Sequence, residues 1–235
     1  MKRKIVMILC TSILMGSMVA CGEKSEAPKS NDSSVSADQE VSVDNTKDEA
    51  PEIKEEDITM DSLREREPNS ESDFEIMSNG DGTCQIQEYV GTSSVIVVPD
   101  KINGDVVKSV HVYAFANNDK ITAVKFSDSI EEIGGGVCGN CTSLKYVICG
   151  SGTKKIGEGA FVNTGMEELE LNEGLEELGT LWISGSYDDW SIKITIPESV
   201  TKLTDFGGIG VSVRVKAGSV AEELAKDSIY EYETY

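Results

Sequence analysis

ITAVKFSDSIEEIGGGVCGNCTS (residues 121–143), LKYVICGSGTKKIGEGAFVNTG (144–165) and MEELELNEGLEELG (166–179) are consecutive versions of one pattern. Apolar residues return at matching places in each unit. Steps of 23, 23, 22 and 25 residues separate the members of one series, which are Val110, Ile133, Ile156, Leu178 and Leu203. A repeat of this length, made of one strand with a turn or short helix, stacks on its neighbours as a solenoid. The spacing therefore predicts about five stacked repeats.

Two further series keep the same phase along the chain. One consists of Val124, Val147, Leu169 and Ile194, and the other of Phe115, Cys138, Phe161 and Ile183. Each repeat is thus expected to contribute several side chains to a continuous core.

Several short motifs within these units match a known repeat. They are Val98-Pro99, Ala114-Phe115, Ile133-Gly134, Asn140-Cys141-Thr142-Ser143-Leu144, Ile156-Gly157, Ala160-Phe161 and Ile196-Pro197. The units resemble the leucine-rich repeats of the BspA-like surface-protein family, whose pattern is approximately L-x-x-V-x-I-P-x-x-V-x-x-I-G-x-x-A-F-x-x-C-x-x-L. The resemblance runs from about Ser93 to the C-terminus. It departs from the pattern at Cys138, at Cys149 and at the insertion over residues 185–190.

This resemblance implies a fold and a class of function. The expected fold is a right-handed, leucine-rich-repeat-like solenoid, α/β to mainly β. It should have one parallel strand face, short helices or turns elsewhere and a cap at each end. The implied activity is adhesion to proteins of a host or of neighbouring cells, although a shared fold does not identify a ligand.

The N-terminus has the features of an export signal. Lys2, Arg3 and Lys4 precede a mostly apolar stretch over residues 5–15 that is too short to span a bilayer. The sequence Met18-Val19-Ala20-Cys21-Gly22 resembles the bacterial lipobox, in which the cysteine is lipidated and becomes the mature N-terminus, although leucine is more usual at position 18. Residues 1–20 are therefore expected to be a signal peptide and Cys21 the lipidation site. The alternative is an ordinary secretory signal that ends near a cysteine.

The remaining boundaries follow from composition. Residues 21–73 are rich in Ser, Asp, Glu and Lys and are expected to form a disordered acidic tether, with a short helix near Asp61 to Glu67 conceivable. Residues 74–92 are expected to be an N-terminal capping hairpin that turns at Asn79–Gly82. The repeats then occupy residues 93–216, and a helix and a strand cap the end over residues 217–235.

Charge and composition limit the classes of partner that the chain is expected to bind. The formal net charge is -21, with one histidine and little arginine, which argues against binding to nucleic acid. No cofactor is expected, and membrane attachment is expected only through the lipid anchor. The expected location is extracytoplasmic, on the bacterial membrane or cell surface, and the expected partner is an extracellular or host protein.

The candidates for chemistry are few. His111 is the only imidazole, and catalysis or a metal site needs convergent groups. Cys138 and Cys141 have redox or metal spacing, yet a second ligand pair is missing, so buried thiols or a disulfide are the interpretations that remain. Asn79–Gly82 has part of a calcium loop but lacks the later ligands, which favours a turn. The sequence therefore predicts neither a catalytic nor a metal site.

A binding surface is the stronger candidate. Alternation along each strand directs Val124 and Phe126 inward and their neighbours outward. Stacking then predicts a ligand-binding sheet face with an apolar centre and a charged rim, made of Lys125, Tyr146, Ile148, Glu168, Glu170 and Lys193. The alternative is a solvated face. A second aromatic group, Trp182, Tyr187 and Trp190, lies in or near the insertion and can equally be core packing.

These observations favour noncatalytic protein binding or adhesion by a surface-displayed lipoprotein. The alternative is an accessory or catalytic module of a cell-envelope enzyme that modifies wall or glycan, for which Asp188 and Asp189 beside Trp190 are the only local hint. A small-molecule-binding lipoprotein would need a two-lobed α/β sequence, which the repeat pattern opposes.

Overall fold

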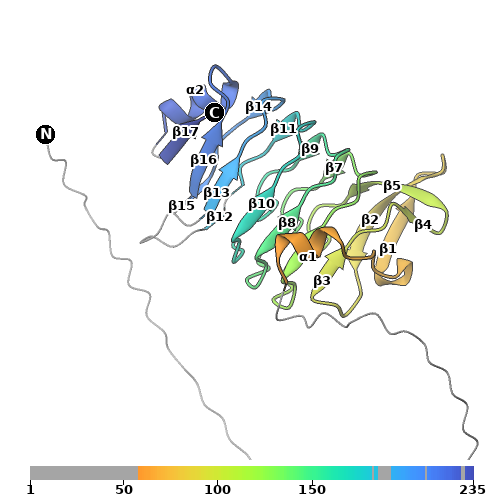
Figure 1. Ribbon diagram of the computed structural model, residues 1–235. Coiled ribbons are helices and arrows are strands. Elements are labelled where there is room, and N and C mark those ends of the chain that lie inside the picture. Colours follow the sequence, from red (N-terminus) through yellow and green to blue (C-terminus); the bar gives the residue numbers. More distant parts are fainter. Residues whose placement is uncertain (1–57, 182, 185–191, 210, 229–230) are drawn as a thin grey trace, which may run out of the picture. The chain divides into compact units, whose positions relative to one another are not determined.

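The computed structural model of the chain describes residues 58–181, 183–184, 192–209, 211–228 and 231–235 (Figure 1). The expected signal peptide and the tether up to residue 57 lie outside the described residues. So do several residues singled out from the sequence, namely Cys21, Trp182, Tyr187, Asp188, Asp189 and Trp190. Among the helices that the structure describes, none combines the length and apolar character needed to cross a bilayer.

The repeats form a solenoid of parallel strands in two sheets. Sheet B has the order β10-β8-β6-β3, and its strands are Val95–Val97 (β3), Ala123–Lys125 (β6), Tyr146–Ile148 (β8) and Glu168–Glu170 (β10). Sheet A has the order β1-β2-β5-β7-β9-β11-β14, and its repeat strands are Asp105–Val110 (β5), Glu132–Ile133 (β7), Lys155–Ile156 (β9), Glu177–Leu178 (β11) and Lys202–Leu203 (β14). The predicted solenoid is confirmed. The sequence predicted one parallel strand face, and the structure has a second parallel sheet as well.

The second sheet consists largely of strands only two residues long. In β7 and β9 the first residue is charged and exposed, and the second is a buried isoleucine. Such a pair carries too little alternation to predict a strand by itself. Its hydrogen bonds exist because the next repeat stacks directly beside it.

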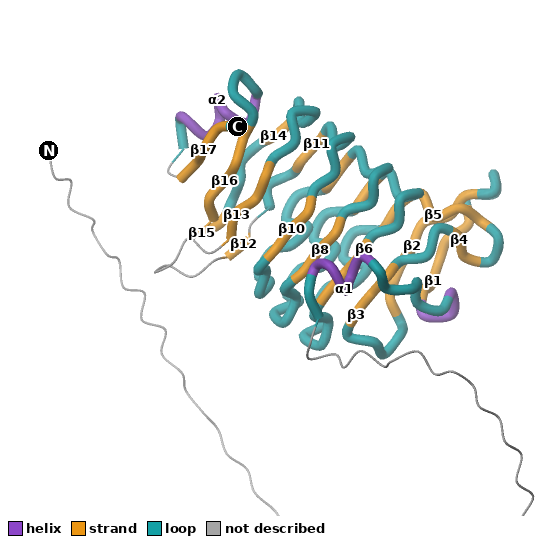
Figure 2. Tube along the Cα trace, viewed as in Figure 1, coloured by secondary structure: helices purple, strands orange, loops and turns teal. Residues whose placement is uncertain are grey.

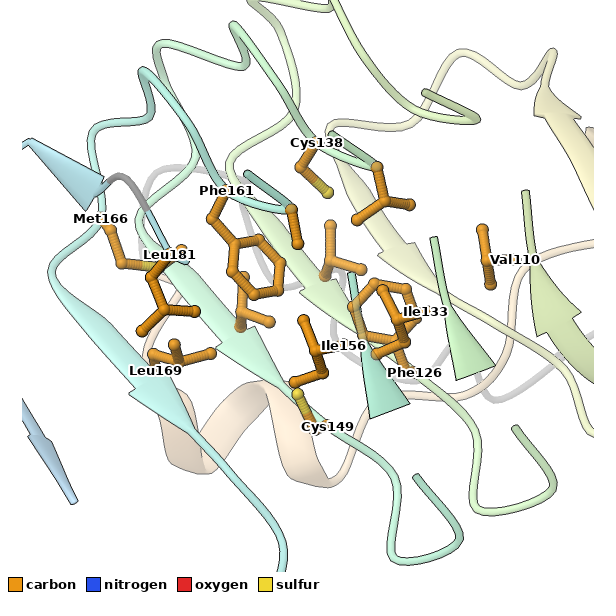
Figure 3. Packing of buried hydrophobic residues seen from close by; sticks show 14 of the residues in the cluster. Val110, Phe126, Ile133, Cys138, Cys149, Ile156, Phe161, Met166, Leu169 and Leu181 are labelled. Atoms are coloured by element: carbon orange, nitrogen blue, oxygen red, sulfur yellow. The ribbon is translucent and has the colours of Figure 1, made fainter. Parts of the chain in front are cut away.

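The strand register confirms the first predicted core series and three members of the second, whose fourth member, Ile194, lies on a strand of another sheet. In sheet A, Val110 pairs with Ile133, Ile133 with Ile156, Ile156 with Leu178 and Leu178 with Leu203. In sheet B, Val124 pairs with Val147 and Val147 with Leu169. Phe126 and Phe161 fill the space between the sheets and are almost completely buried (Figure 3). The apolar residues of each repeat thus form continuous rows through one core.

A row of asparagines runs along the turns that connect the two sheets. Asn117, Asn140 and Asn163 have φ values of 59°, 62° and 55°, a left-handed conformation that asparagine tolerates better than most residues. Asn140 Nδ2 donates to Asn117 Oδ1 at 2.9 Å, and Asn163 Nδ2 donates to Asn140 Oδ1 at 3.0 Å. The turns therefore repeat with the same period as the core.

The N-terminal end is closed by a hairpin. Strands Phe74–Ser78 (β1) and Thr83–Tyr89 (β2) pair antiparallel, and β2 also pairs parallel with β5. The turn between them has Gly80 and Gly82 at φ 79° and 83°. A 3₁₀ helix, Glu71–Asp73, precedes the hairpin, and strand Lys101–Ile102 (β4) pairs antiparallel with β5.

The C-terminal end adds two smaller sheets and a helix. Strands Ile192–Thr195 (β13), Val211–Val215 (β16) and Glu231–Thr234 (β17) form one sheet, and strands Ile183–Ser184 (β12) and Gly208–Ile209 (β15) form another. Helix Val220–Lys226 (α2) is capped by Ser219, whose Oγ accepts from Glu222 N at 3.2 Å. Its buried residues, Ala221 and Ala225, join the core.

The expectation of a disordered tether up to Asp73 is wrong for its last part. Residues 60–64 form helix Met60–Arg64 (α1), which contacts β6 and β8 of sheet B (Figure 2). Met60 is 8% exposed and Leu63 is completely buried. The segment is ordered because its few apolar residues pack on the sheet, although they cannot make a core of their own.

Candidate functional site

The outer face of sheet B brings together most of the residues predicted to bind a ligand. Lys125 pairs with Ile148 and Ile148 with Glu170, while Tyr146 pairs with Glu168. The sixth residue, Lys193, lies on β13, which belongs to another sheet but contacts β10. The stacking that places these residues side by side agrees with the prediction.

The exposure of that face differs from the prediction in its apolar half. Ile148 was expected to be exposed but is only 6% exposed, and Tyr146 is partly buried. A small cluster covers this part of the sheet, made of Ile58, Met60, Leu63, Val95, Val97, Ala123 and Ile148, with Tyr146 packed against it. Helix α1 therefore occupies the expected binding surface.

Polar contacts fix α1 in one orientation on the sheet. Lys125 Nζ donates to the backbone oxygen of Arg64 at 2.5 Å, so a positive charge meets the C-terminal end of the helix. Arg64 forms an ion pair with Glu170 on β10 and another with Asp61 at 2.5 Å. Its hydrogen bond with Glu170 is the main reason that the pKa of Arg64 is raised. Thus Lys125 and Glu170, two predicted site residues, hold the helix.

The chain that follows α1 is fastened to the edge of the sheet. Asn69 N donates to Val97 O at 2.9 Å, and Val97 N donates to Asn69 Oδ1 at 2.6 Å. These bonds occupy backbone groups of β3, the edge strand of sheet B. Farther along, Asn103 N donates to a Glu71 carboxylate oxygen at 2.6 Å. Residues 69–71 are therefore attached to the solenoid at several points.

Concave surface borders the helix and the residues beside it. A cavity of about 580 Å³ lies beside Ile58 and Tyr146 and is lined also by Lys120, Thr122 and Lys145. A second cavity, of about 240 Å³, lies beside Met60 and Arg64 and is lined also by Glu168, Lys193 and Thr195. The face of sheet B is therefore longer than the part that α1 covers.

Charged groups surround the larger cavity. Glu167 accepts from the Tyr146 hydroxyl at 3.0 Å and forms an ion pair with Lys145 at 2.8 Å. The pKa of Glu167 is lowered chiefly by its bond to Lys145, and partial burial together with Glu167 raises the pKa of Tyr146. Tyr146 is therefore a neutral hydrogen-bonding aromatic residue, of the kind that anchors protein interfaces.

The remaining sequence candidates lie apart from this face. His111 is exposed, and its Nδ1 lies 3.0 Å from Val112 O. Asn79–Gly82 forms the hairpin turn, in which Thr83 N donates to Asp81 Oδ1 at 3.0 Å. Within the described parts of the chain, no three His, Cys, Asp or Glu residues are grouped as a metal site would require.

The four cysteines of the described chain are free and buried: Cys84, Cys138, Cys141 and Cys149. Burial raises the pKa of Cys149 to about 12, with Glu170 adding to the effect, and burial also raises the pKa of Cys138. Cys141 Sγ donates to Phe115 O at 3.1 Å. The pKa of Cys141 is instead lowered, chiefly by a hydrogen bond with Cys138. All four thiols are enclosed and unpaired by disulfides, in agreement with the buried-thiol interpretation.

Sequence reasoning allowed a short helix in the segment before the hairpin, but it did not predict that this helix packs on sheet B. Its signal is short: Ile58, Met60 and Leu63 are apolar within an otherwise polar stretch. Thr59 and Ser62 also form a reciprocal cap, in which Ser62 N donates to Thr59 Oγ1 at 3.2 Å and Thr59 N donates to Ser62 Oγ at 2.9 Å. Such a cap three residues apart is a helix-start signature when an apolar face is available.

Comparisons with known proteins agree with this architecture. The family model for the BspA type leucine rich repeat region matches residues 108–206 in six copies. A crystal structure of a leucine-rich repeat protein of T. pallidum is similar at a TM-score of 0.54 and 22% identity, over 63% of this chain and 71% of that one. A leucine-rich cell surface protein of Faecalibacterium prausnitzii A2-165 matches at a TM-score of 0.40 and 23% identity, over 66% and 46%.

The T. pallidum structure shows a shared solenoid fold at this level of identity. The search of curated protein sequences gave no match. The family match covers most of both ladders, because residues 108–206 include β7, β9, β11 and β14 of sheet A and β6, β8 and β10 of sheet B. The chain is therefore a protein with a BspA-type leucine-rich repeat region over residues 108–206.

Proposed function

We propose that this chain is a noncatalytic protein-binding lipoprotein, displayed on a bacterial cell surface through lipid on Cys21, and that the outer face of sheet B is its binding surface. One observation carries the second part: this face already binds a helix, the chain's own α1, through an apolar centre and charged contacts. The repeat family, whose members are generally noncatalytic, supports a binding role.

The surface has the composition expected of a modest protein interface. Its centre is apolar around Ile148, Tyr146 supplies an aromatic group with a polar tip, and Glu168 and Lys193 are exposed at its rim. Interfaces of this kind draw most of their binding energy from a few central residues, with the charged rim adding specificity.

The export signal and lipobox support surface display. Two or three acyl chains give stable membrane attachment at roughly 0.8 kcal/mol per buried methylene. The strongly acidic chain would be repelled by an anionic envelope, which would hold its folded part away from the membrane.

Binding of the mature chain to arrays of matrix proteins, host glycans and bacterial wall fragments tests this proposal. The variant Glu168→Lys with Lys193→Glu changes the exposed rim without changing net charge. The matched control, Glu132→Lys with Lys155→Glu, swaps an ion pair of 2.8 Å on sheet A. We expect saturable binding to a protein, weakened at least tenfold in the first variant and unchanged in the control.

Two outcomes would contradict the proposal. Equal loss in both variants would show that the sheet B face is not the binding surface. Binding confined to wall or glycan fragments, with chemical change of the fragment, would instead support a module of a cell-envelope enzyme.

A further inference from the structure

Residues 58–67, called the latch here, pack on sheet B through helix α1 and the residues beside it. Ile58, Met60 and Leu63 lie against Val95, Val97, Ala123 and Ile148, and these three latch residues are at most 8% exposed. Removing the latch would leave an apolar strip across β3, β6 and β8. Exposed strips of this kind on a soluble domain are typical of binding surfaces.

The latch has little helical stability of its own. Helix α1 is five residues long, while isolated helices shorter than about 12 to 15 residues are marginal in water. Its internal support is the Thr59–Ser62 cap and the Arg64–Asp61 ion pair. The helix therefore depends on docking, and an undocked latch has no structure to retain.

The sheet recognises the latch by features that any short amphipathic helix can offer. The apolar strip receives Met60 and Leu63, three residues apart on one helical face. Lys125 receives the C-terminal backbone oxygen of the helix, and Glu170 receives a basic side chain one turn beyond Met60. Together these groups specify the direction of the bound helix as well as its apolar face.

The latch also leaves part of the face unused. The cavities of about 580 Å³ and 240 Å³ lie beside Ile58 and beside Met60 of the latch. A helix longer than one turn would reach one or both, and would meet Tyr146 and Lys145 in the first or Glu168 and Lys193 in the second. A longer occupant can therefore bury more surface than the latch does.

We infer that the latch is a displaceable internal competitor. When it leaves, the sheet B face binds an amphipathic helix of a partner protein that carries an apolar pair three residues apart and a basic residue for Glu170. This inference rests on the proposed function, because it names the partner chemistry for the same face. When a face is occupied in cis, its apparent affinity for a partner is the intrinsic affinity multiplied by the fraction of time for which the face is uncovered.

The first experiment uses a peptide of residues 58–67, labelled with a fluorophore and stapled between the exposed positions 61 and 65 to preform the helix. Its binding is measured to the full mature chain carrying Leu63→Asp, which releases the latch. Wild type and Glu67→Gln, a change at an exposed latch position, serve as controls. We expect saturable binding to the Leu63→Asp chain, at least tenfold tighter than to either control. The same peptide with Leu63→Asp should not bind.

Native-state hydrogen exchange gives a test that needs no variant. The Leu63 amide donates to Thr59 O at 2.9 Å within the latch, and the Cys149 amide donates to Glu170 O at 3.0 Å within the solenoid. We expect the Leu63 amide of the wild-type chain to exchange at least a hundredfold faster than that of Cys149, because the latch opens without unfolding of the solenoid.

The outcomes separate this inference from the proposed function. Three outcomes would each overturn the inference that the latch is displaceable. They are equal exchange rates of the Leu63 and Cys149 amides, equal peptide affinity for wild type and the Leu63→Asp chain, and self-association of that chain without binding of the peptide. In these cases partner binding on the array can still succeed. Conversely, the peptide can bind as expected while no protein on the array binds. That result would support the displaceable latch and contradict the adhesive role.

Discussion

At Gly157 the backbone of one repeat passes so close to the preceding repeat that a side chain has no space. A Cβ atom there would lie 2.4 Å from Gly135 N and 2.8 Å from Gly135 Cα. Both contacts are with backbone, which cannot move without shifting sheet A. We predict that Gly157→Ala lowers the free energy of unfolding by about 2 kcal/mol or more, measured by urea denaturation.

Gly174→Ala is the matched control at this scale. Its Cβ would meet the Asn172 side-chain nitrogen at 3.3 Å and Ser151 O at 3.6 Å, so little has to move. We expect a change within about 0.5 kcal/mol, since the loss of glycine freedom in the unfolded chain offsets any crowding. Similar losses in both variants would show that the close approach at Gly157 does not limit the fold.

The buried thiol of Cys149 predicts a fall in stability at high pH. Burial raises its pKa from the ordinary 9.0 to about 12, so between these values unfolding releases a proton. The contribution of the protonated Cys149 thiol to the free energy of unfolding is complete below pH 9. It is lost as pH rises toward 12, by at most about 1.4 kcal/mol per pH unit. Urea midpoints at pH 8 to 11 should therefore decline less steeply in Cys149→Val than in wild type. Parallel declines would assign the effect to other groups.

At the scale of the element, the packing of α1 on sheet B indicates that a stable domain must include the residues before Phe74. A chain that starts at Phe74 lacks the cover over Val95, Val97, Ala123 and Ile148. Burial of an apolar side chain such as Leu63 contributes about 1.5 to 3 kcal/mol, and the cost of ordering the segment offsets much of the total gain. We therefore predict that the shorter chain loses about 1 to 3 kcal/mol of its free energy of unfolding relative to a chain that starts at Glu55.

Two measurements check this prediction. The shorter chain should bind a hydrophobic dye more strongly while its far-ultraviolet circular dichroism remains that of a folded sheet protein. Its urea midpoint should be lower by the stated free energy. Equal dye binding by the two chains would mean that the exposed strip closes without α1.

The elements show how far sequence reasoning reaches. The strands of sheet B were predictable, because Val124, Val147 and Leu169 alternate with outward residues at a constant period. A short helix near Asp61 to Glu67 was one option from the sequence, but its docking was not predictable, because a five-residue segment gains its stability from a surface assembled by residues 95–148. For the same reason the residues expected on the sheet face lie side by side, but Ile148 is buried and not exposed.

On the scale of the whole molecule, the repeat period determines the architecture. A fixed step places each turn, such as that of Asn140, directly above its equivalent in the previous repeat, and hydrogen bonds between equivalents follow. Stability then accumulates from contacts between neighbouring repeats. The period does not predict the caps at the two ends of the repeats, and the N-terminal cap was inferred from the turn signal at Asn79–Gly82.

The whole molecule also carries the prediction of a lipid anchor at Cys21. Residues 1–20 have a basic start and an apolar stretch too short to span a bilayer, and Met18-Val19-Ala20-Cys21-Gly22 resembles a lipobox. In a bacterial host, we expect metabolic labelling with palmitate and partition into the detergent phase. Both should be lost in Cys21→Ser and retained in Cys10→Ser, which alters a cysteine within the signal. Mass spectrometry should find the mature N-terminus at acylated Cys21. Label that persists in Cys21→Ser, or an unmodified N-terminus at another residue, would favour an ordinary secretory signal, and the solenoid would then act as a released protein.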